Sequence, residues 1–334
     1  NPENEKSVSN NHVFRIYQSP TDIFWFGTLK GGINKYDPYR KKFIHYKFPN
    51  HHPTHNRILS FYQDTNNYYW IGTRGGGLMK ILRCDTSQNM VEKGLSQSDF
   101  ESHCRKEQQQ VFHYQLEENA SDKFNKNDIY DINQIEKGSI WLGTSEGLFI
   151  FDTKKGEATH AREIQSIPDS SVFRKFVYFI YKDPQYSGRL FWLGTSNGIV
   201  RYDTKENTYT YIGYRKESRY SINNATVYTI LRDSKQNIWL GTRGGGINKM
   251  ISEPPLYKNP DSTKQKAFFV NDSLSKFVFF DKTKSGKSQI NHNVIMTIFE
   301  DSKQRLWIGT RGGGLAKVEK NIDTMVTFSH VMQQ

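Results

Sequence analysis

The chain has 334 residues, a formal net charge of +12 and 14% aromatic residues, and this aromatic content favours strands over helices. It contains no uncharged apolar run of about 18 residues, the length that a membrane-spanning helix needs. The excess of basic residues suits nucleic acid, anionic lipid or acidic sugars, and a lysine surplus from codon bias explains it equally well.

Six copies of one phrase, each headed by a tryptophan, run through the sequence. In chain order they are WFGTLKGGI at Trp25, WIGTRGGGL at Trp70, WLGTSEGLF at Trp141, WLGTSNGIV at Trp192, WLGTRGGGI at Trp239 and WIGTRGGGL at Trp307. An apolar run of strand length precedes each phrase: VFRIYQ, ILSFYQD, IYDINQ, VYFIYKD, VYTILRD and IMTIFED. The phrase itself predicts a second strand, a tight glycine turn and a third strand, and a weaker fourth strand closes most units.

Four antiparallel strands per unit, repeated at about 45 residues, are the pattern of a β-propeller. We therefore predict an all-β fold with six recognisable four-stranded blades, and a seven-bladed or larger assembly stays open. The long intervals after the second and fifth phrases hold insertions at about 84–110 and 251–274, which we interpret as polar loops between third and fourth strands. The blades are expected at residues 11–50, 56–118, 127–165, 172–215, 224–282 and 292–331.

The segments INNATVYTILRDSKQNIWLGTRGGGINK and INHNVIMTIFEDSKQRLWIGTRGGGLAK carry a family resemblance. They resemble the two-component regulator propeller repeat, and the resemblance covers the whole chain in six units. It implies the periplasmic sensor region of a hybrid two-component regulator that responds to an oligosaccharide. It also implies a homodimer formed through the parent protein, and a histidine kinase beyond a membrane helix that this sequence lacks. The family commonly has seven blades per propeller, and other outputs such as diguanylate cyclases occur.

The polar start, NPENEKSVSNN, lacks the apolar core of a signal peptide. This predicts either a cytoplasmic chain or part of a longer protein, and the resemblance favours the latter.

The glycine turns are the predicted binding surface. Because antiparallel strands alternate in direction, the turn between the second and third strands lies at the blade edge where the first strand starts. The paired N–H donors of an arginine guanidinium suit a carboxylate or a sulfate. The hypothesis is therefore that cations converging from several blades bind an acidic oligosaccharide. The alternative is that each arginine lies on its neighbouring blade and pairs with an aspartate or a carbonyl. The candidate ligand-binding residues are Lys30, Arg74, Arg243, Arg311, Asn11, His12, Asn56, Asn127, His292 and Asn293.

Other chemistry is less well supported by the sequence. No hydrolase, zinc-protease or phosphate-loop motif is present, so we expect no catalytic residues, no metal and no cofactor. The recurring Asp64, Asp183, Asp233 and Asp301 indicate turns, and the HHPTH stretch at His51 indicates a solvated loop. Cys84 and Cys104 form either one disulfide or two separate thiols.

Two alternative functions remain open at this point. One is a propeller enzyme of the lyase type, for which His12 and His292 are the candidate residues. The other is a protein-docking propeller that uses the two insertions. Nucleic-acid binding is not supported, because the basic residues are spread along the chain without an interleaved aromatic cluster.

Overall fold

The structure is a computed structural model, and its described part is made of strands with short turns. It describes residues 4–18, 24–38, 41–46, 56–66, 68–81, 112–114, 116, 128–161, 175–218, 220–258, 260–261, 266–269, 274–284, 286–322 and 324–331. Two 3₁₀ helices occur there, η4 (Pro184–Tyr186) and η5 (Gly286–Ser288). The fold is all-β with six four-stranded blades, as the repeat predicts. Cys84, Cys104, Asn127, the His51–His55 stretch and the insertion at 84–110 lie outside the described residues.

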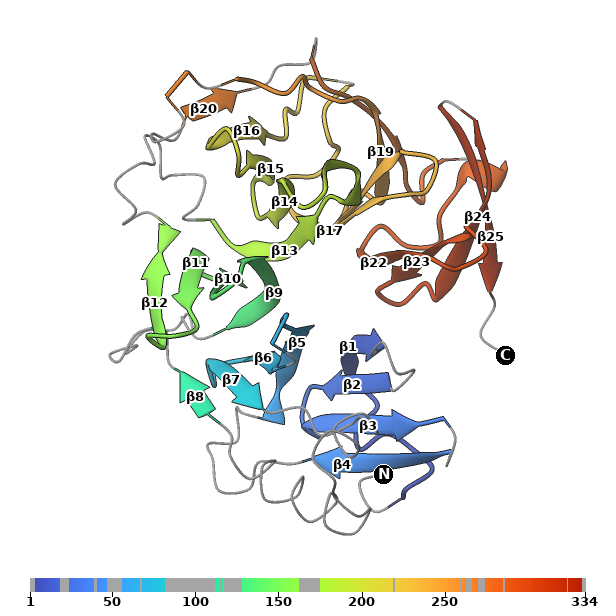
Figure 1. Cartoon of the computed structure of the whole chain (residues 1–334). Coiled ribbons are helices and arrows are strands. Elements are labelled where there is room, and N and C mark those ends of the chain that lie inside the picture. The colour runs from blue at the N-terminus through green and yellow to red at the C-terminus, as the bar shows by residue number, and fades with distance from the viewer. Residues whose placement is uncertain are drawn as a thin grey trace. The chain divides into compact units, whose positions relative to one another are not determined.

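The chain divides into two compact units. The first comprises Asn1–Ser145 and Phe149–Thr159, and the second comprises Glu146–Leu148 and His160–Gln334. Blades 1 to 3 fall largely in the first unit and are antiparallel sheets whose strands follow chain order (Figure 1). Their strands are β1 (Val13–Gln18), β2 (Phe24–Thr28), β3 (Ile33–Asp37) and β4 (Lys42–Tyr46); β5 (Ile58–Gln63), β6 (Tyr69–Thr73), β7 (Leu78–Ile81) and β8 (Phe112–Tyr114); β9 (Ile129–Glu136), β10 (Ser139–Thr144), β11 (Gly147–Asp152) and β12 (Glu157–His160).

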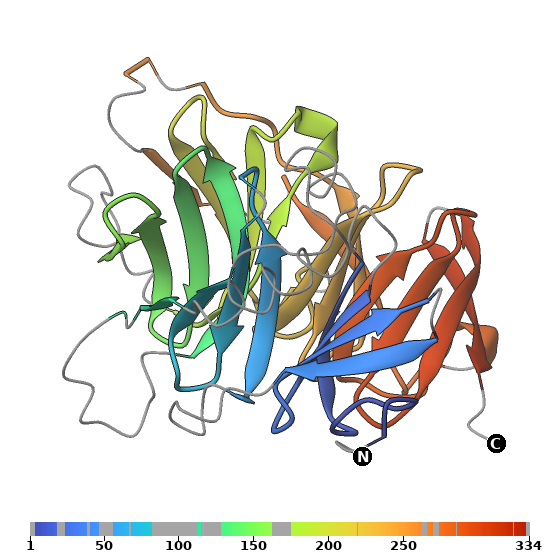
Figure 2. The same ribbon diagram turned by 60° about the horizontal axis from the view of Figure 1, so that its bottom comes forward.

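The second unit holds blades 4 to 6, of which blade 6 is the red sheet in Figure 2. Their strands are β13 (Val177–Lys182), β14 (Leu190–Thr195), β15 (Gly198–Asp203) and β16 (Thr208–Ile212); β17 (Val227–Arg232), β18 (Ile238–Thr242), β19 (Ile247–Ser252) and β21 (Lys276–Phe280); β22 (Ile295–Glu300), β23 (Leu306–Thr310), β24 (Leu315–Ile322) and β25 (Met325–Val331).

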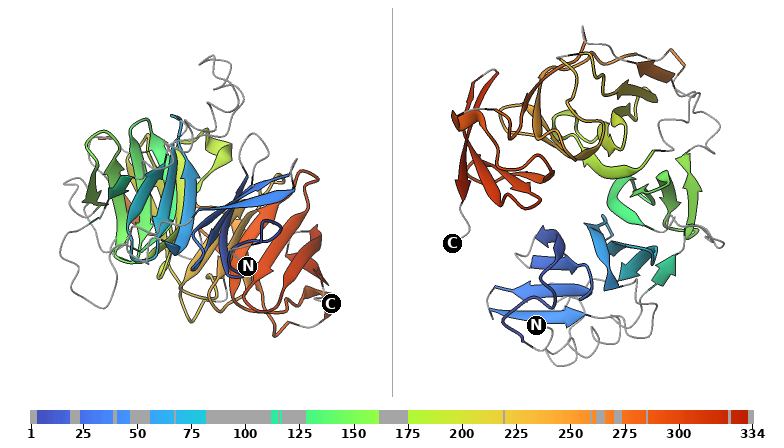
Figure 3. Two further views of the ribbon diagram at one scale, coloured as in Figure 1. Left: turned by 90° about the horizontal axis from the view of Figure 1, so that it is seen from below. Right: turned by 180° about the vertical axis from the view of Figure 1, so that it is seen from behind.

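The insertion at 251–274 differs from the polar loop that the sequence predicts. It contains a strand, β20 (Lys266–Phe269), which pairs in parallel with β16, so Thr208 lies opposite Lys266. Blade 4 thereby gains a fifth strand from a segment that belongs to blade 5 in the sequence (Figure 3). The physical reason is that β16 is a sheet edge, and an edge strand offers unpaired backbone groups to any extended segment nearby.

The core of each unit lies between successive blades. In the second unit Trp192 of β14 is fully buried against Val227 and Ile230 of β17, and Trp239 of β18 is buried against Ile295 and Ile298 of β22. The tryptophan therefore fills the gap to the next blade, which is why every repeat needs a large apolar side chain at this position.

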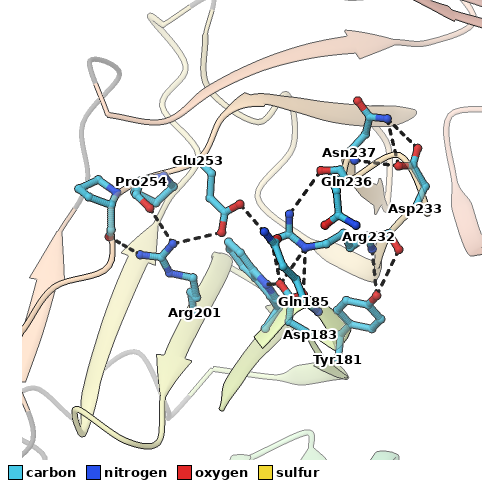
Figure 4. A network of polar contacts seen from close by, with 12 residues as sticks. Tyr181, Asp183, Gln185, Arg201, Arg232, Asp233, Gln236, Asn237, Glu253 and Pro254 are labelled. Atoms are coloured by element: carbon cyan, nitrogen blue, oxygen red, sulfur yellow. Dashed lines mark hydrogen bonds and ion pairs between the residues drawn. The ribbon is translucent and has the colours of Figure 1, made fainter. Parts of the chain in front are cut away.

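A buried polar network fastens the inserted segment to blades 4 and 5. The Arg232 guanidinium donates to Asp183 at 2.8 Å and to Glu253 at 3.0 Å, and Arg201 donates to Glu253 at 3.3 Å (Figure 4). Arg201 also donates to the carbonyls of Pro254 and Pro255, so each buried arginine reaches more than one acceptor. Buried cations persist only when they are paired in this way.

Candidate functional site

A threonine hydroxyl closes the glycine turn of the repeat. In blade 5 the Thr242 hydroxyl accepts from the Gly245 amide at 2.9 Å and donates to the Gly246 carbonyl at 2.9 Å. Gly246 has a φ of 72°, a conformation that L side chains rarely adopt. The same pair of bonds forms at Thr28, Thr73 and Thr310. The GTxxGG pattern therefore builds a rigid turn and fixes the backbone of the residue after the threonine.

Each turn lies beside the start of the first strand of its own blade, as alternating strand direction predicts. The amide of Arg243 donates to the carbonyl of Thr226 at 3.0 Å. Arg311 and Arg74 make the same bond to Val294 and Arg57, at 2.9 and 2.7 Å. The residue after each threonine is thus held at this edge of the blade, which we call the turn edge.

Three glycine amides of the turns donate to the neighbouring blade. Gly246 donates to the carbonyl of Asn293 at 2.9 Å, and Gly198 donates to that of Ala225 at 2.6 Å. In the first unit Gly32 donates to Asn56 in the same way. A further turn amide, that of Gly245, is bound to Thr242. These amides are therefore not available to a ligand.

The four predicted cations differ in their partners. Arg74 Nε lies 3.9 Å from a carboxylate oxygen of Asp128, so this arginine follows the alternative in which it pairs with a neighbouring blade. Burial raises the pKa of Asp128, and Arg74 acts in the opposite direction. Lys30, Arg243 and Arg311 are exposed, and within the described ranges no carboxylate lies within ion-pair distance of them.

The predicted polar residues at the start of the first strands cap local backbone. The Nδ1 atom of His292 accepts from the Val294 amide at 3.0 Å, and the Asn293 side chain accepts from the Lys282 amide at 2.8 Å. Asn56 offers its carbonyl to Gly32, as noted above, whereas Asn11 and His12 are exposed. Most of these residues thus have a structural role at the turn edge.

Sequence reasoning missed a β-bulge in every first strand. Between Val227 and Thr229 the register of β17 against β18 shifts by one residue, which leaves Tyr228 without a partner on the next strand. The other blades shift at the same point, and bulges of this kind re-aim a side chain. The bulged residues are Phe14, Leu59, Tyr130, Tyr178, Tyr228 and Met296. The sequence shows an apolar or aromatic residue at the second position of each first strand. It does not show that the register shifts there.

Comparison with known proteins agrees with the repeat. The family model described as the two component regulator propeller matches residues 53–75, 221–244 and 289–312. These three stretches are similar to two-component regulator propeller repeats. The histidine kinase P4 of Formosa agariphila is 26% identical over 228 residues, which cover 58% of this chain. The chain spans only 16% of that relative's length.

Solved structures of similar fold also match. The extracellular domain of the putative hybrid two component system BT3049 from B. thetaiotaomicron has a TM-score of 0.59 and 17% identity over 94% of this chain and 34% of its own. An ancestral GH74 enzyme has a TM-score of 0.62 and 11% identity over 98% of this chain and 41% of its own. PorZ, a surface component of the type-IX secretion system of Porphyromonas gingivalis, has a TM-score of 0.54 and 15% identity over 91% of this chain and 38% of its own. At these identities the likeness is one of fold.

No group of three or more His, Cys, Asp or Glu side chains among the described residues is arranged to hold a metal ion. In the same residues no helix is long and apolar enough to cross a membrane.

Proposed function

We propose that this chain is the ligand-sensing region of a hybrid two-component regulator, and that it binds an acidic oligosaccharide at the turn edge of the second unit. The observation that carries the proposal is the pair of exposed arginines, Arg243 and Arg311, held on rigid turns without a carboxylate partner among the described residues. A guanidinium that is not already paired is available to a carboxylate or sulfate of a ligand.

The cellular setting of the proposal comes from the relatives. The chain is similar to a histidine kinase and to an extracellular domain of a putative two-component system. We place the sensor on the periplasmic side of the inner membrane, with a histidine kinase elsewhere in the full-length protein and with signalling through a homodimer. Ligand binding would then change the pairing of the kinase subunits. This requires that the ligand binds the two pairing states of the dimer with different affinities.

The test is calorimetric titration of the chain with acidic oligosaccharides, comparing the wild type with Arg243→Ala and Arg311→Ala. Losing a charge-assisted hydrogen bond should weaken binding about tenfold or more for each variant. Lys235→Ala and Lys303→Ala remove the same charge from the same two blades, on exposed turns between the first and second strands, and should bind as the wild type does. Unchanged affinity in both arginine variants, with the fold intact, rules out the turn edge as the site.

The same mixtures test the enzyme alternative. One structure of similar fold is a GH74 enzyme, and a likeness of fold does not carry its activity to this chain. A sensor should leave the oligosaccharides intact after prolonged incubation, as judged by mass spectrometry. Shortened products, lost in His292→Ala, would instead support a lyase or hydrolase.

A further inference from the structure

The bulges of blades 4 and 5 bring two tyrosines together at the turn edge. Tyr178 is the bulged residue of β13 and Tyr228 is that of β17, and both are half-buried. Their ring centroids lie 4.9 Å apart with the planes 79° from parallel, and Phe176 adds a third ring 5.8 Å from Tyr178. Since the rings come from neighbouring blades, the cluster exists only in the folded second unit.

Arg243 lies beside this aromatic cluster. Its amide is bound to Thr226, two residues before Tyr228, and Val227 lies opposite Thr242 in the sheet. Burial raises the pKa of Tyr178 to about 12, Tyr228 adds to this rise, and the positive charge of Arg243 opposes it. The Tyr178 hydroxyl therefore stays neutral at physiological pH while it lies within the field of the guanidinium.

The equivalent positions elsewhere do not reproduce this combination. In blade 3 the hydroxyl of the bulged Tyr130 donates to Asp128 at 3.4 Å, the carboxylate that also pairs with Arg74. In blade 6 the bulged residue beside Arg311 is Met296, which has no ring. Within the described residues, only the turn edge between blades 4 and 5 combines an edge-to-face pair of tyrosines with an arginine that lacks a carboxylate partner.

We infer that Tyr178, Tyr228 and Arg243 form the subsite for one hexuronic acid residue of the oligosaccharide, with the Tyr228 ring against the sugar face, the Tyr178 ring edge-on beside it and the guanidinium on the carboxylate. This inference rests on the proposed function and names the sugar class that the site takes. Sugar rings present apolar C–H faces that pack on aromatic rings, and arginine binds carboxylate in a planar, two-pronged geometry. A neutral sugar would leave the guanidinium without its partner, whereas a small carboxylate would leave the rings uncovered.

The experiment titrates the chain with uronic acid trisaccharides of the galacturonate, mannuronate and glucuronate types, each beside its methyl ester. The ester keeps the sugar face and removes the charge. We expect at least one acid to bind, and its ester to bind about tenfold or more weakly. Tyr228→Ala should weaken binding of the acid by about tenfold. Tyr228→Phe, which keeps the ring, should bind the acid within about threefold of the wild type. Arg243→Ala should weaken binding of the acid more than Arg311→Ala does.

A measurement on the wild type guards against a variant that fails to fold. Saturation-transfer NMR should show magnetisation passing from the aromatic protons of the protein to the ring C–H protons of a single sugar residue. Absence of this transfer with a bound acid overturns the stacking role.

The outcomes separate the inference from the proposed function. If an acid binds and its affinity depends on Arg243 but not on the ring of Tyr228, the proposed function stands and the subsite is wrong. If acid and ester bind alike, the uronic acid assignment is wrong. If none of the trisaccharides binds, the uronic acid subsite is wrong, and the proposed function fails as well only if no acidic oligosaccharide, carboxylated or sulfated, binds in the first titration.

Discussion

The indole nitrogen of Trp239 donates a hydrogen bond to the Asp233 carboxylate at 2.8 Å, in the buried interior of blade 5. The same carboxyl group accepts from the Asn237 amide at 2.7 Å, so it ties the turn between β17 and β18 to the tryptophan that fills the gap to blade 6. The bond recurs between Asp64 and Trp70, Asp183 and Trp192, and Asp301 and Trp307. The recurring aspartate thus orients the recurring tryptophan.

The first prediction concerns this bond. Asp233→Ala leaves the buried indole N–H of Trp239 without its acceptor, and should lower the free energy of unfolding by about 2–3 kcal/mol. Asp281→Ala is a control, because among the described residues the Asp281 side chain accepts only from Thr283, in an exposed turn. Urea denaturation followed by tryptophan fluorescence measures both, and equal losses would contradict the role given to Asp233.

The second prediction compares two glycines of one phrase. A Cβ on Gly246 would overlap the Phe280 carbonyl oxygen, and its φ of 72° disfavours a side chain. A Cβ on Gly244 would meet nothing closer than the Asn224 side chain at 3.3 Å. Gly246→Ala should therefore destabilise the protein by more than about 1 kcal/mol, whereas Gly244→Ala should change little. Thermal unfolding of the two variants provides the comparison.

The third prediction concerns the network under the inserted segment. Burial lowers the pKa of Arg201, and the charge of Glu253 opposes this shift. Glu253→Gln keeps the shape and removes the charge that Arg201 and Arg232 share, so we expect a loss of about 1–3 kcal/mol of unfolding free energy. Glu217→Gln, at an exposed position, is the matched control. A Glu253→Gln variant as stable as the control would show that Asp183 and the proline carbonyls compensate the two arginines by themselves.

The fourth prediction is a dependence of stability on alkaline pH. The pKa of Tyr178 is raised from 10.0 to about 12 in the folded protein, mainly by burial. Between these values the unfolded chain binds fewer protons than the folded one, so the stability that Tyr178 contributes is complete below about pH 10 and is lost as pH approaches 12. Tyr178→Phe cannot lose this proton. Its unfolding free energy should therefore fall less steeply than that of the wild type between pH 9.5 and 11.5, and parallel curves in urea denaturation would contradict the assignment.

Much of the fold follows from short-range sequence pattern. The spacing of Trp239 from Asp233 on one side and from Gly246 on the other is the same in several repeats, because these residues interact within one blade across two or three neighbouring strands. The backbone bond between Arg243 and Thr226 follows in the same way from antiparallel pairing. Of the candidate site, the sequence therefore predicted the arginine and its edge of the blade.

What the sequence determined by itself is the repeat, the four-stranded blade and the turn that carries Arg243, since each depends on local spacing and on the φ that glycine alone tolerates. Only the tertiary structure decided that Arg74 pairs with Asp128, that Tyr178 meets Tyr228 and that β20 joins the sheet of β16. These contacts join different blades, and no periodicity within a repeat specifies which side chains of the next blade will lie opposite. They depend on a bulge and on a free sheet edge, which become visible only when the blades are packed.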